Sequence, residues 1–163
     1  MSRAVGVSRT GYRFRPVSAA APNEWTESTL EALRDDGRRN GSARRAVVEL
    51  LGRQDCCLTA QQIFDELRAE GRRVGIASVY RVLDLLTEKG LLQRVELGEG
   101  TARYEPAHAG GEHHHHLVCA DCGKVEAFED DELERALHRV ESRTGYSVAG
   151  HDVVLRGVCR DCS

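Results

Sequence analysis

Residues 59–106, TAQQIFDELRAEGRRVGIASVYRVLDLLTEKGLLQRVELGEGTARYEP, decide the fold of this chain. Thr59 followed by Gln62 is the pattern of a capping box, in which the Thr side chain accepts from the third helical amide and the Gln reaches back. This pattern opens a predicted helix that reaches about Glu70. Apolar residues at helical spacing predict a second helix over 77–89.

The segment that follows changes its period from about four residues to two. Residues 91–97 and 101–105 are short extended segments around Gly98-Glu99-Gly100, which predicts a β-hairpin. Before Thr59, apolar residues at helical spacing predict helices over 26–36 and 42–52. Helix, turn, helix and hairpin in this order predict a winged helix.

Composition and charge bound the possible functions. The 163 residues suffice for one ordinary domain or two small ones, and the 30% of charged residues suit a soluble protein. No run approaches the ~18 apolar residues of a membrane span, and no apolar stretch resembles a secretory signal. We therefore expect a cytoplasmic protein without a membrane partner. Residues 38–94 carry a net charge of +4 and residues 95–163 a net charge of −7, which favours a polyanion-binding part and a metal- or partner-binding part.

The chain divides into four predicted parts: a flexible tail over 1–24, a winged-helix DNA-binding domain over 25–105, a linker over 106–112 and a metal-binding domain over 113–163. In the last part we expect strands over 113–119 and 124–128, a helix over 132–143 and an extended segment over 146–158. The helix would begin at a cap formed by Asp130 or Asp131 and bury Leu133, Ala136, Leu137 and Val140. All seven histidines and four of the six cysteines lie between His108 and the C-terminus.

Two Cys-x-x-Cys pairs predict a structural zinc site made by Cys119, Cys122, Cys159 and Cys162. Each such turn directs two thiolates at one centre, and four sulfurs in a tetrahedron are what structural zinc prefers. Disulfides are the alternative, but they are rare in cytosolic proteins. Cys56 and Cys57 are interpreted by default as small, partly buried residues.

The run His113–His116 can supply two different metal centres if it lies on a strand. Successive side chains then face opposite sides, so His113 and His115 face one way and His114 and His116 the other. Candidate partners are Glu105, His108 and Cys57 for one centre, and Glu134 and His151 for the other. A hydrolase is disfavoured, because the sequence has no HExxH motif and no nucleophile elbow. A metal-storing or structural interaction module stays as another alternative.

The sequence resembles the ferric uptake regulator family of iron-, zinc-, manganese- and peroxide-responsive repressors. The resemblance covers roughly residues 27–162. It rests on TAQQIFDEL, GIASVYRVLDLLTEKGL, ARYEP, HHHHLVCADCGKV and TGYSVAGHDVVLRGVC in the family's order. It implies a homodimer whose subunits each join a winged helix to a small α/β dimerisation domain, an α+β fold overall. It also implies repression at a palindromic double-stranded DNA operator, without a catalytic site or a small-molecule substrate.

The resemblance also assigns metal ligands. His114, His116 and Glu105 match the regulatory site, and Cys57 stands where several members have a histidine from the winged-helix domain. A second dimer-domain site is matched by His113, His115, Glu134 and His151.

Two departures from the family's pattern bear on the metal. Ala127 stands where iron and peroxide sensors often have a carboxylate, although Glu126 is a possible replacement. Cys57 replaces a histidine, and His108 stands where zinc-sensing members often have a cysteine. Loss of an oxygen ligand and gain of a sulfur favour Zn²⁺ over Fe²⁺ as the regulatory ion.

Several residues are candidates for DNA contact. Ser78, Tyr80 and Arg81 are the polar residues near the start of the second helix of the helix–turn–helix, where a recognition helix reaches bases and phosphates. The resemblance places Arg39 at the minor groove, and Arg44 is a candidate for phosphate contact.

Overall fold

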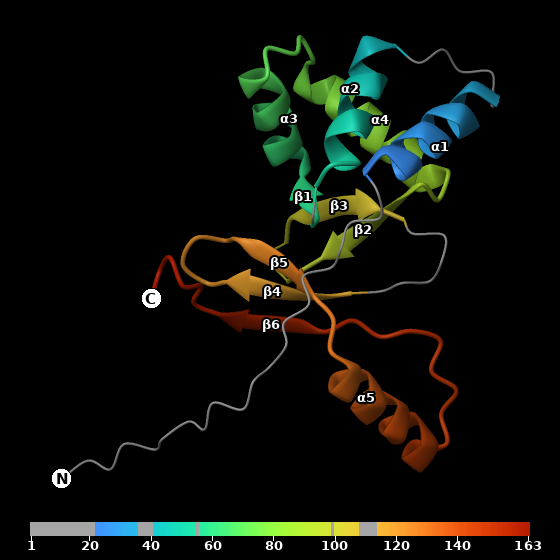
Figure 1. The fold of residues 1–163 in the computed structure, drawn as a ribbon, viewed down its shortest axis with the longest axis vertical. Helices are drawn as coiled ribbons and strands as arrows, with labels where there is room; N and C mark the ends of the chain where they lie inside the picture. Colours follow the sequence, from blue (N-terminus) through green and yellow to red (C-terminus); the bar gives the residue numbers. More distant parts are fainter. Residues whose placement is uncertain (1–21, 36–40, 55, 99, 108–113) are drawn as a thin grey trace.

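The computed structural model describes residues 22–35, 41–54, 56–98, 100–107 and 114–163. It has two parts, with four helices above one small sheet and a second small sheet below it, from which a fifth helix extends (Figure 1). Among these residues, no helix combines the length and apolar content that crossing a bilayer requires. Arg39, His108 and His113 lie outside the described residues, so the predictions that concern them have no structural counterpart.

The upper part has the predicted helices and hairpin. Its elements are α1 (Pro22–Asp35), α2 (Ser42–Leu51), α3 (Ala60–Ala69), α4 (Ile76–Glu88), β2 (Leu92–Glu96) and β3 (Ala102–Pro106). The capping box is confirmed, because the Gln62 amide donates to Thr59 Oγ1 over 3.1 Å and the Thr59 amide donates to Gln62 Oε1 over 2.9 Å. Helix α1 begins at Pro22, four residues before the predicted 26.

The sequence did not predict β1 (Leu58–Thr59), which pairs antiparallel with β3 in a sheet of order β1-β3-β2. Two residues are too few for a periodic pattern to indicate a strand. The pairing aligns Leu58 with Tyr104 and Thr59 with Arg103. It therefore ties the chain just before α3 to the strand that carries Glu105.

The core of the upper part is made by apolar side chains of α1 to α4. Leu33, Val47, Leu50, Ile63 and Leu83 are fully enclosed. Burying a Leu or Ile side chain stabilises a fold by about 1.5–3 kcal/mol, so these contacts hold the four helices together.

The lower sheet has the order β5-β4-β6. Its strands are β4 (His115–Cys119), β5 (Val125–Phe128) and β6 (Val154–Gly157), and β4 pairs antiparallel with β5 and parallel with β6. The predicted extended segment over 146–158 is wrong in its first half, since only its residues 154–157 form a strand.

Helix α5 (Asp131–Thr144) connects β5 to the segment before β6. Asp130 caps it, because one carboxylate oxygen accepts from the amides of Glu132 and Leu133. The prediction that Leu133, Ala136, Leu137 and Val140 are buried is wrong for the single chain, in which no α5 residue is buried and Val140 is 52% exposed. The helix extends away from the lower sheet (Figure 1), and the described residues leave Leu133, Ala136 and Leu137 only half-buried.

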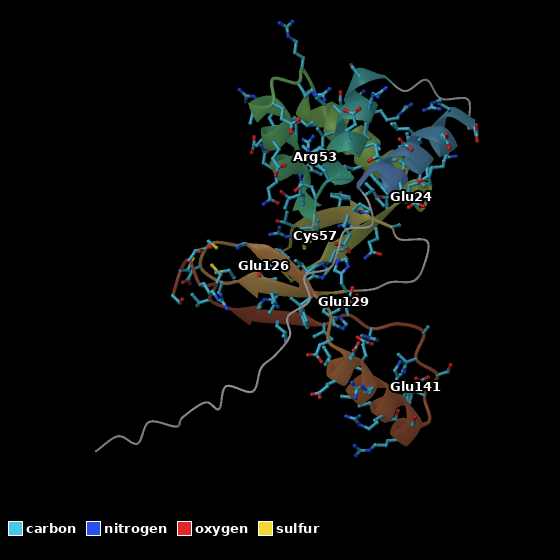
Figure 2. The ribbon with its side chains drawn as sticks, in the orientation of Figure 1. Glu24, Arg53, Cys57, Glu126, Glu129 and Glu141 are labelled. Atoms are coloured by element: carbon cyan, nitrogen blue, oxygen red, sulfur yellow. The ribbon has the colours of Figure 1, made fainter. Side chains whose placement is uncertain are left out.

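A small apolar cluster joins the two parts. Cys57, Leu97 and Val118 are buried together, with half-buried Cys56, Val95, Val125 and Val154 packed against them. Arg156 of β6 also donates to the Leu97 carbonyl, and Arg103 of β3 donates to the Gly123 carbonyl over 3.5 Å. Figure 2 shows Cys57 between the two sheets. The hairpin of the winged helix therefore packs on the lower sheet beside Cys56 and Cys57.

Candidate metal centres

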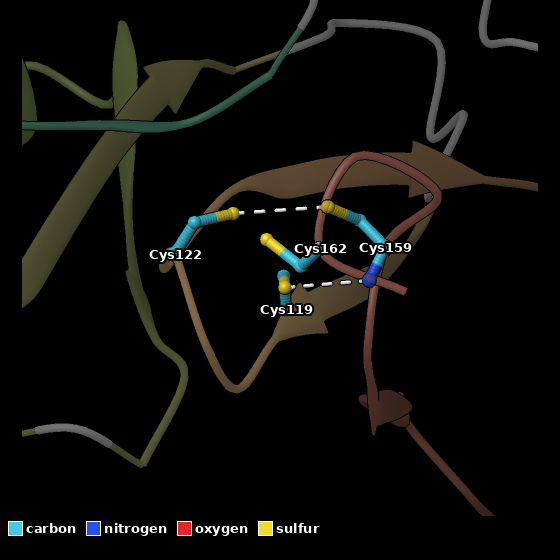
Figure 3. Close-up of side chains that lie close together, drawn as sticks. All are labelled: Cys119, Cys122, Cys159 and Cys162. Carbon is cyan, nitrogen blue, oxygen red and sulfur yellow. Dashed lines mark hydrogen bonds between the residues drawn. The ribbon is translucent and has the colours of Figure 1, made fainter.

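Cys119, Cys122, Cys159 and Cys162 converge on one point at the end of the lower sheet (Figure 3). Their ligand atoms all lie within 4.8 Å of one another, and all four are free thiols. The sulfurs of Cys122 and Cys159 are 3.8 Å apart. Tetrahedral zinc with Zn–S bonds of about 2.3 Å places two sulfurs about 3.8 Å apart, so the arrangement fits this ion. We call it the four-cysteine site.

Backbone amides favour the thiolate of Cys119 in the four-cysteine site, whereas hydrogen bonds with Cys159 and Cys122 raise the pKa of Cys162 to about 12. Hydrogen bonds from the amides of Cys122 and Cys159 lower the pKa of Cys119 to about 6, and the Cys159 amide donates to Cys119 Sγ over 3.3 Å. The first turn closes through Gly123, whose φ of +70° favours glycine. Thiolates held by amide donors are the species that zinc binds.

A second cluster lies between the two parts and consists of Cys56, Cys57, Glu105 and His116. Its four ligand atoms also lie within 4.8 Å of one another. The cysteines precede β1, Glu105 lies on β3 and His116 on β4, so the winged helix and the lower sheet both contribute. Glu105 is 2% exposed, Cys57 2% and His116 6%. We call these residues the central cluster.

Hydrogen bonds to Glu105 organise the central cluster. Its Oε2 lies 3.1 Å from His114 Nε2 and 3.4 Å from His116 Nε2, while Gln93 Nε2 donates to Oε1 over 2.6 Å. Burial opposes ionisation, yet the bonds to His114 and His116 outweigh it and lower the pKa of Glu105 to about 2. Glu105 is therefore a fixed carboxylate, which a cation-binding site requires.

The two thiols of the central cluster interact with each other and with His116. Their sulfurs are 3.9 Å apart. The hydrogen bond between them lowers the pKa of Cys56 to about 5 against the opposing effect of burial, and the same bond, followed by burial, raises the pKa of Cys57. Burial opposes the charged form of His116, but bonds to Cys56 and Glu105 raise its pKa to about 9. A dense group of potential ligands at this position fits a divalent ion, which would replace the protons they share.

The third cluster comprises His115, Glu134 and His151, here called the histidine–glutamate cluster. Glu134 Oε1 lies 2.6 Å from His115 Nε2 and 3.3 Å from His151 Nε2. His115 is on β4 and Glu134 in the first turns of α5. Neighbouring histidines of one strand thus reach two clusters, as alternation on a strand requires.

One residue of the central cluster, Cys56, and one residue that contacts it, Gln93, were not singled out from the sequence. Cys56 was interpreted as a packing residue, although its adjacency to Cys57 was an available indication. Gln93 was missed because a glutamine on a hairpin has no distinctive pattern, and only the β2–β3 register, which pairs Gln93 with Glu105, reveals its role.

The candidates for DNA contact differ in exposure. Tyr80 is 49% exposed and Arg81 is exposed, both on α4, whereas Ser78 is half-buried. Arg81 Nε donates to the Ala77 carbonyl of its own helix over 3.1 Å. Arg44 on α2 is half-buried. The open face of α4 therefore presents Tyr80 and Arg81.

Comparison with known proteins agrees with this architecture. The model of the ferric uptake regulator family matches residues 35–156. The chain belongs to this family. The ferric uptake regulation protein of Neisseria gonorrhoeae is 33% identical over 136 residues, covering 83% of this chain and 93% of that protein.

Two solved structures of the family are similar to this chain. The Vibrio cholerae ferric uptake regulator superposes with a TM-score of 0.69 at 30% identity, covering 80% of this chain and 98% of that one. The Helicobacter pylori ferric uptake regulator, described as having three functional metal binding sites, gives 0.73 at 28% identity, covering 88% and 95%. The predicted α+β fold, a winged helix followed by a small dimerisation domain with a four-cysteine cluster, is confirmed. Members of the family are dimeric, metal-responsive regulators of transcription.

Proposed function

We propose that this chain is a zinc-responsive repressor of metal-homeostasis genes. It acts in the cytoplasm and binds a palindromic DNA operator as a homodimer when its regulatory site holds metal. The four-cysteine site carries structural Zn²⁺, and the central cluster together with His114 is the regulatory site. The three ligand clusters found among the described residues parallel the three metal sites described for the Helicobacter pylori protein.

One observation carries the proposal: the central cluster takes its ligands from both parts of the molecule. Cys57 and Glu105 belong to the winged-helix part, and His116 belongs to the lower sheet. An ion bound by all three favours one angle between the parts, because only that angle keeps every ligand in place. In a dimer, that angle sets the spacing of the two α4 helices, which must enter successive major grooves. A coupling of about 1–3 kcal/mol changes DNA affinity by up to ~150-fold.

The strand register supports zinc over iron. Ala127 is paired with His116, so the position that would extend the central cluster has no carboxylate. Glu126 is paired with Leu117, and directly paired residues share a face of the sheet, so its side chain faces away from His116. Glu126 also contacts Lys124 over 2.7 Å. Glu126 therefore does not replace the missing oxygen ligand, and the sulfurs dominate the donor set.

An iron-responsive repressor is the second candidate. It is favoured by the names of the curated relatives, which are ferric uptake regulation proteins. The histidine–glutamate cluster, with nitrogen and oxygen donors alone, is the better place for Fe²⁺ in this chain. The two candidates differ in the metal that activates DNA binding.

DNA recognition is assigned to the exposed face of α4. Arg81 is placed at guanine or phosphate and Tyr80 against a thymine methyl, with Ser78 beside them. Arg44 and Arg39 are assigned to the backbone and the minor groove. Among the described residues, none of Ser78, Tyr80, Arg81 and Arg44 belongs to the central cluster, so the regulatory ion acts on them through the angle between the two parts.

The test is a titration of metal against DNA binding. A duplex selected from a random pool by the zinc-loaded protein is used in a gel shift with Zn²⁺, with Fe²⁺ under anaerobic conditions, and with EDTA. We expect binding at lower concentrations of Zn²⁺ than of Fe²⁺ and none with EDTA. Cys57→Ala should lose the response to zinc and keep the structural ion. Binding that is insensitive to metal would refute the proposal, and a response confined to Fe²⁺ would select the second candidate.

A further inference from the structure

We propose that Cys56 is itself a ligand of the regulatory ion, which is held by two adjacent thiolates, His116 and Glu105, while His114 contacts the Glu105 carboxylate instead of the ion. The family resemblance assigned His114 to the ion and gave Cys56 no role. The inference rests on the proposed function. The proposed function gives the position of the regulatory site, and the inference adds its ligand atoms and the class of ion that they bind.

The separation of the Cys56 and Cys57 sulfurs fits two thiolates on one ion. Cys56 Sγ and Cys57 Sγ are 3.9 Å apart, and the sulfurs of Cys122 and Cys159 in the four-cysteine site are 3.8 Å apart. Both values match the edge of about 3.8 Å expected for two thiolates on tetrahedral zinc. Two thiols in hydrogen-bond contact lie at the same separation, so the sulfur–sulfur distance supports a metal site only together with the His116 nitrogen and Glu105 oxygen that converge on it.

His114 lies outside the group of converging ligand atoms. The ligand atoms of Cys56, Cys57, Glu105 and His116 converge within 4.8 Å, and His114 is not among the converging residues. Its Nε2 instead lies 3.1 Å from Glu105 Oε2, and its ring meets that of His116 edge to face at 4.9 Å. Two sulfurs, one nitrogen and one oxygen already complete a tetrahedron. His114 is thus a positioning residue that orients the ligand carboxylate.

The negative charges of the central cluster require a cation. Two thiolates and a carboxylate bring three negative charges into a cluster lined by Leu97, Val118 and Val154. Isolated charges in such surroundings are costly. A divalent ion supplies two positive charges, and Arg103, which is 5% exposed and electrostatically coupled to Cys57, supplies the third. The surroundings therefore suit a site with two thiolates and a divalent cation.

The donor set defines the class of ion. Two thiolates with one imidazole and one carboxylate suit thiophilic ions with no geometric demand of their own, such as Zn²⁺ and Cd²⁺. Fe²⁺ and Mn²⁺ prefer more oxygen and nitrogen donors than this cluster offers. Adjacent thiolates therefore make this regulatory site selective for thiophilic ions.

Co²⁺ is the probe that counts the thiolates, because each cobalt–thiolate bond adds charge-transfer absorption in the near ultraviolet. The full-length chain is purified with one structural Zn²⁺, and one equivalent of Co²⁺ is added anaerobically. Relative to wild type, we expect the absorption to fall to about half in Cys56→Ser and in Cys57→Ser and to vanish in the double variant, as one thiolate at a time is removed. His114→Ala should keep the full intensity.

Zinc affinity alone does not decide between the roles, because losing a residue that orients a ligand weakens metal binding about 10–100-fold as well. The charge-transfer intensity tests the cysteines, and the visible d–d bands of Co²⁺ test His114, because they shift when an imidazole ligand is lost. Full charge-transfer intensity in Cys56→Ser, or shifted d–d bands in His114→Ala, would overturn the inference. Circular dichroism and retention of the structural zinc show that each variant is folded. If Cys56→Ser also leaves zinc-dependent DNA binding unchanged, the inference fails and the proposed function stands, whereas wild-type binding that ignores metal removes the proposed function itself.

Discussion

At the scale of single residues, Glu105 is the group on which the central cluster depends. One of its oxygens is held by Gln93 at 2.6 Å, which leaves the other for His114 and His116. The carboxylate is almost fully buried, so its direction is set by these partners and by nothing from solvent. A buried ligand fixed in this way loses little freedom when it binds an ion.

Gln93→Ala should therefore weaken zinc binding at the regulatory site about tenfold, because the carboxylate loses the donor that orients it. Competition with a chromophoric chelator measures the affinity, and the structural zinc should be retained. Gln61→Ala is the matched control, since Gln61 only contacts Asp65 of its own helix on the surface. Equal affinities for the Gln93 variant and wild type would show that Gln93 does not orient Glu105.

At the scale of elements, the sequence predicted what depends on local pattern. The capping box at Thr59 and the cap at Asp130 could be predicted because both use contacts within a few residues. Helices α2, α3 and α4 could be predicted from the spacing of their apolar residues. Strand β1 was not, because its only support is pairing with β3, which is distant in sequence.

The ligands of the candidate sites also differ in whether a local sequence pattern predicts them. The spacing of Cys119 and Cys122 predicts a metal site. Alternation along β4 is enough to assign His115 and His116 to different clusters. Cys56 joins the cluster only through the docking of the hairpin on the lower sheet. No local pattern encodes that long-range contact.

Helix α5 leads to a prediction about assembly. Its apolar stripe is only partly covered by the described residues of the single chain, with Val140 52% exposed. Members of the family are dimeric, so we expect a second copy to cover it. Val140→Glu should raise the dimer dissociation constant at least ~100-fold, because an unpaired charge would be buried. Light scattering after gel filtration measures the mass, and Ser142→Glu, an equal charge change at an exposed position of the same helix, should stay dimeric. A dimeric Val140→Glu variant would place the interface elsewhere.

At the scale of the whole molecule, the two parts have separate sources of stability. The upper part has an apolar core shared by α1 to α4. The lower sheet contributes only a few buried residues, among them Val118 and Phe128. A metal ion that links its strands therefore contributes a larger share of the stability of this part. The four-cysteine site joins the end of β4 to the chain beyond β6, and the central cluster joins the lower sheet to the upper part.

Loss of the structural ion should therefore destabilise one part and spare the other. In Cys162→Ser we expect one zinc fewer per chain and faster hydrogen exchange of the amides in β4, β5 and β6, because binding energy of structural zinc is folding energy. The amides of α2, α3 and α4 should exchange as in wild type, since their core does not involve the site. Cys57→Ser is the control, which weakens the regulatory site and keeps the lower sheet protected. A uniform rise in exchange over both parts would mean that the molecule unfolds as one unit and that the four-cysteine site supports the winged helix as well.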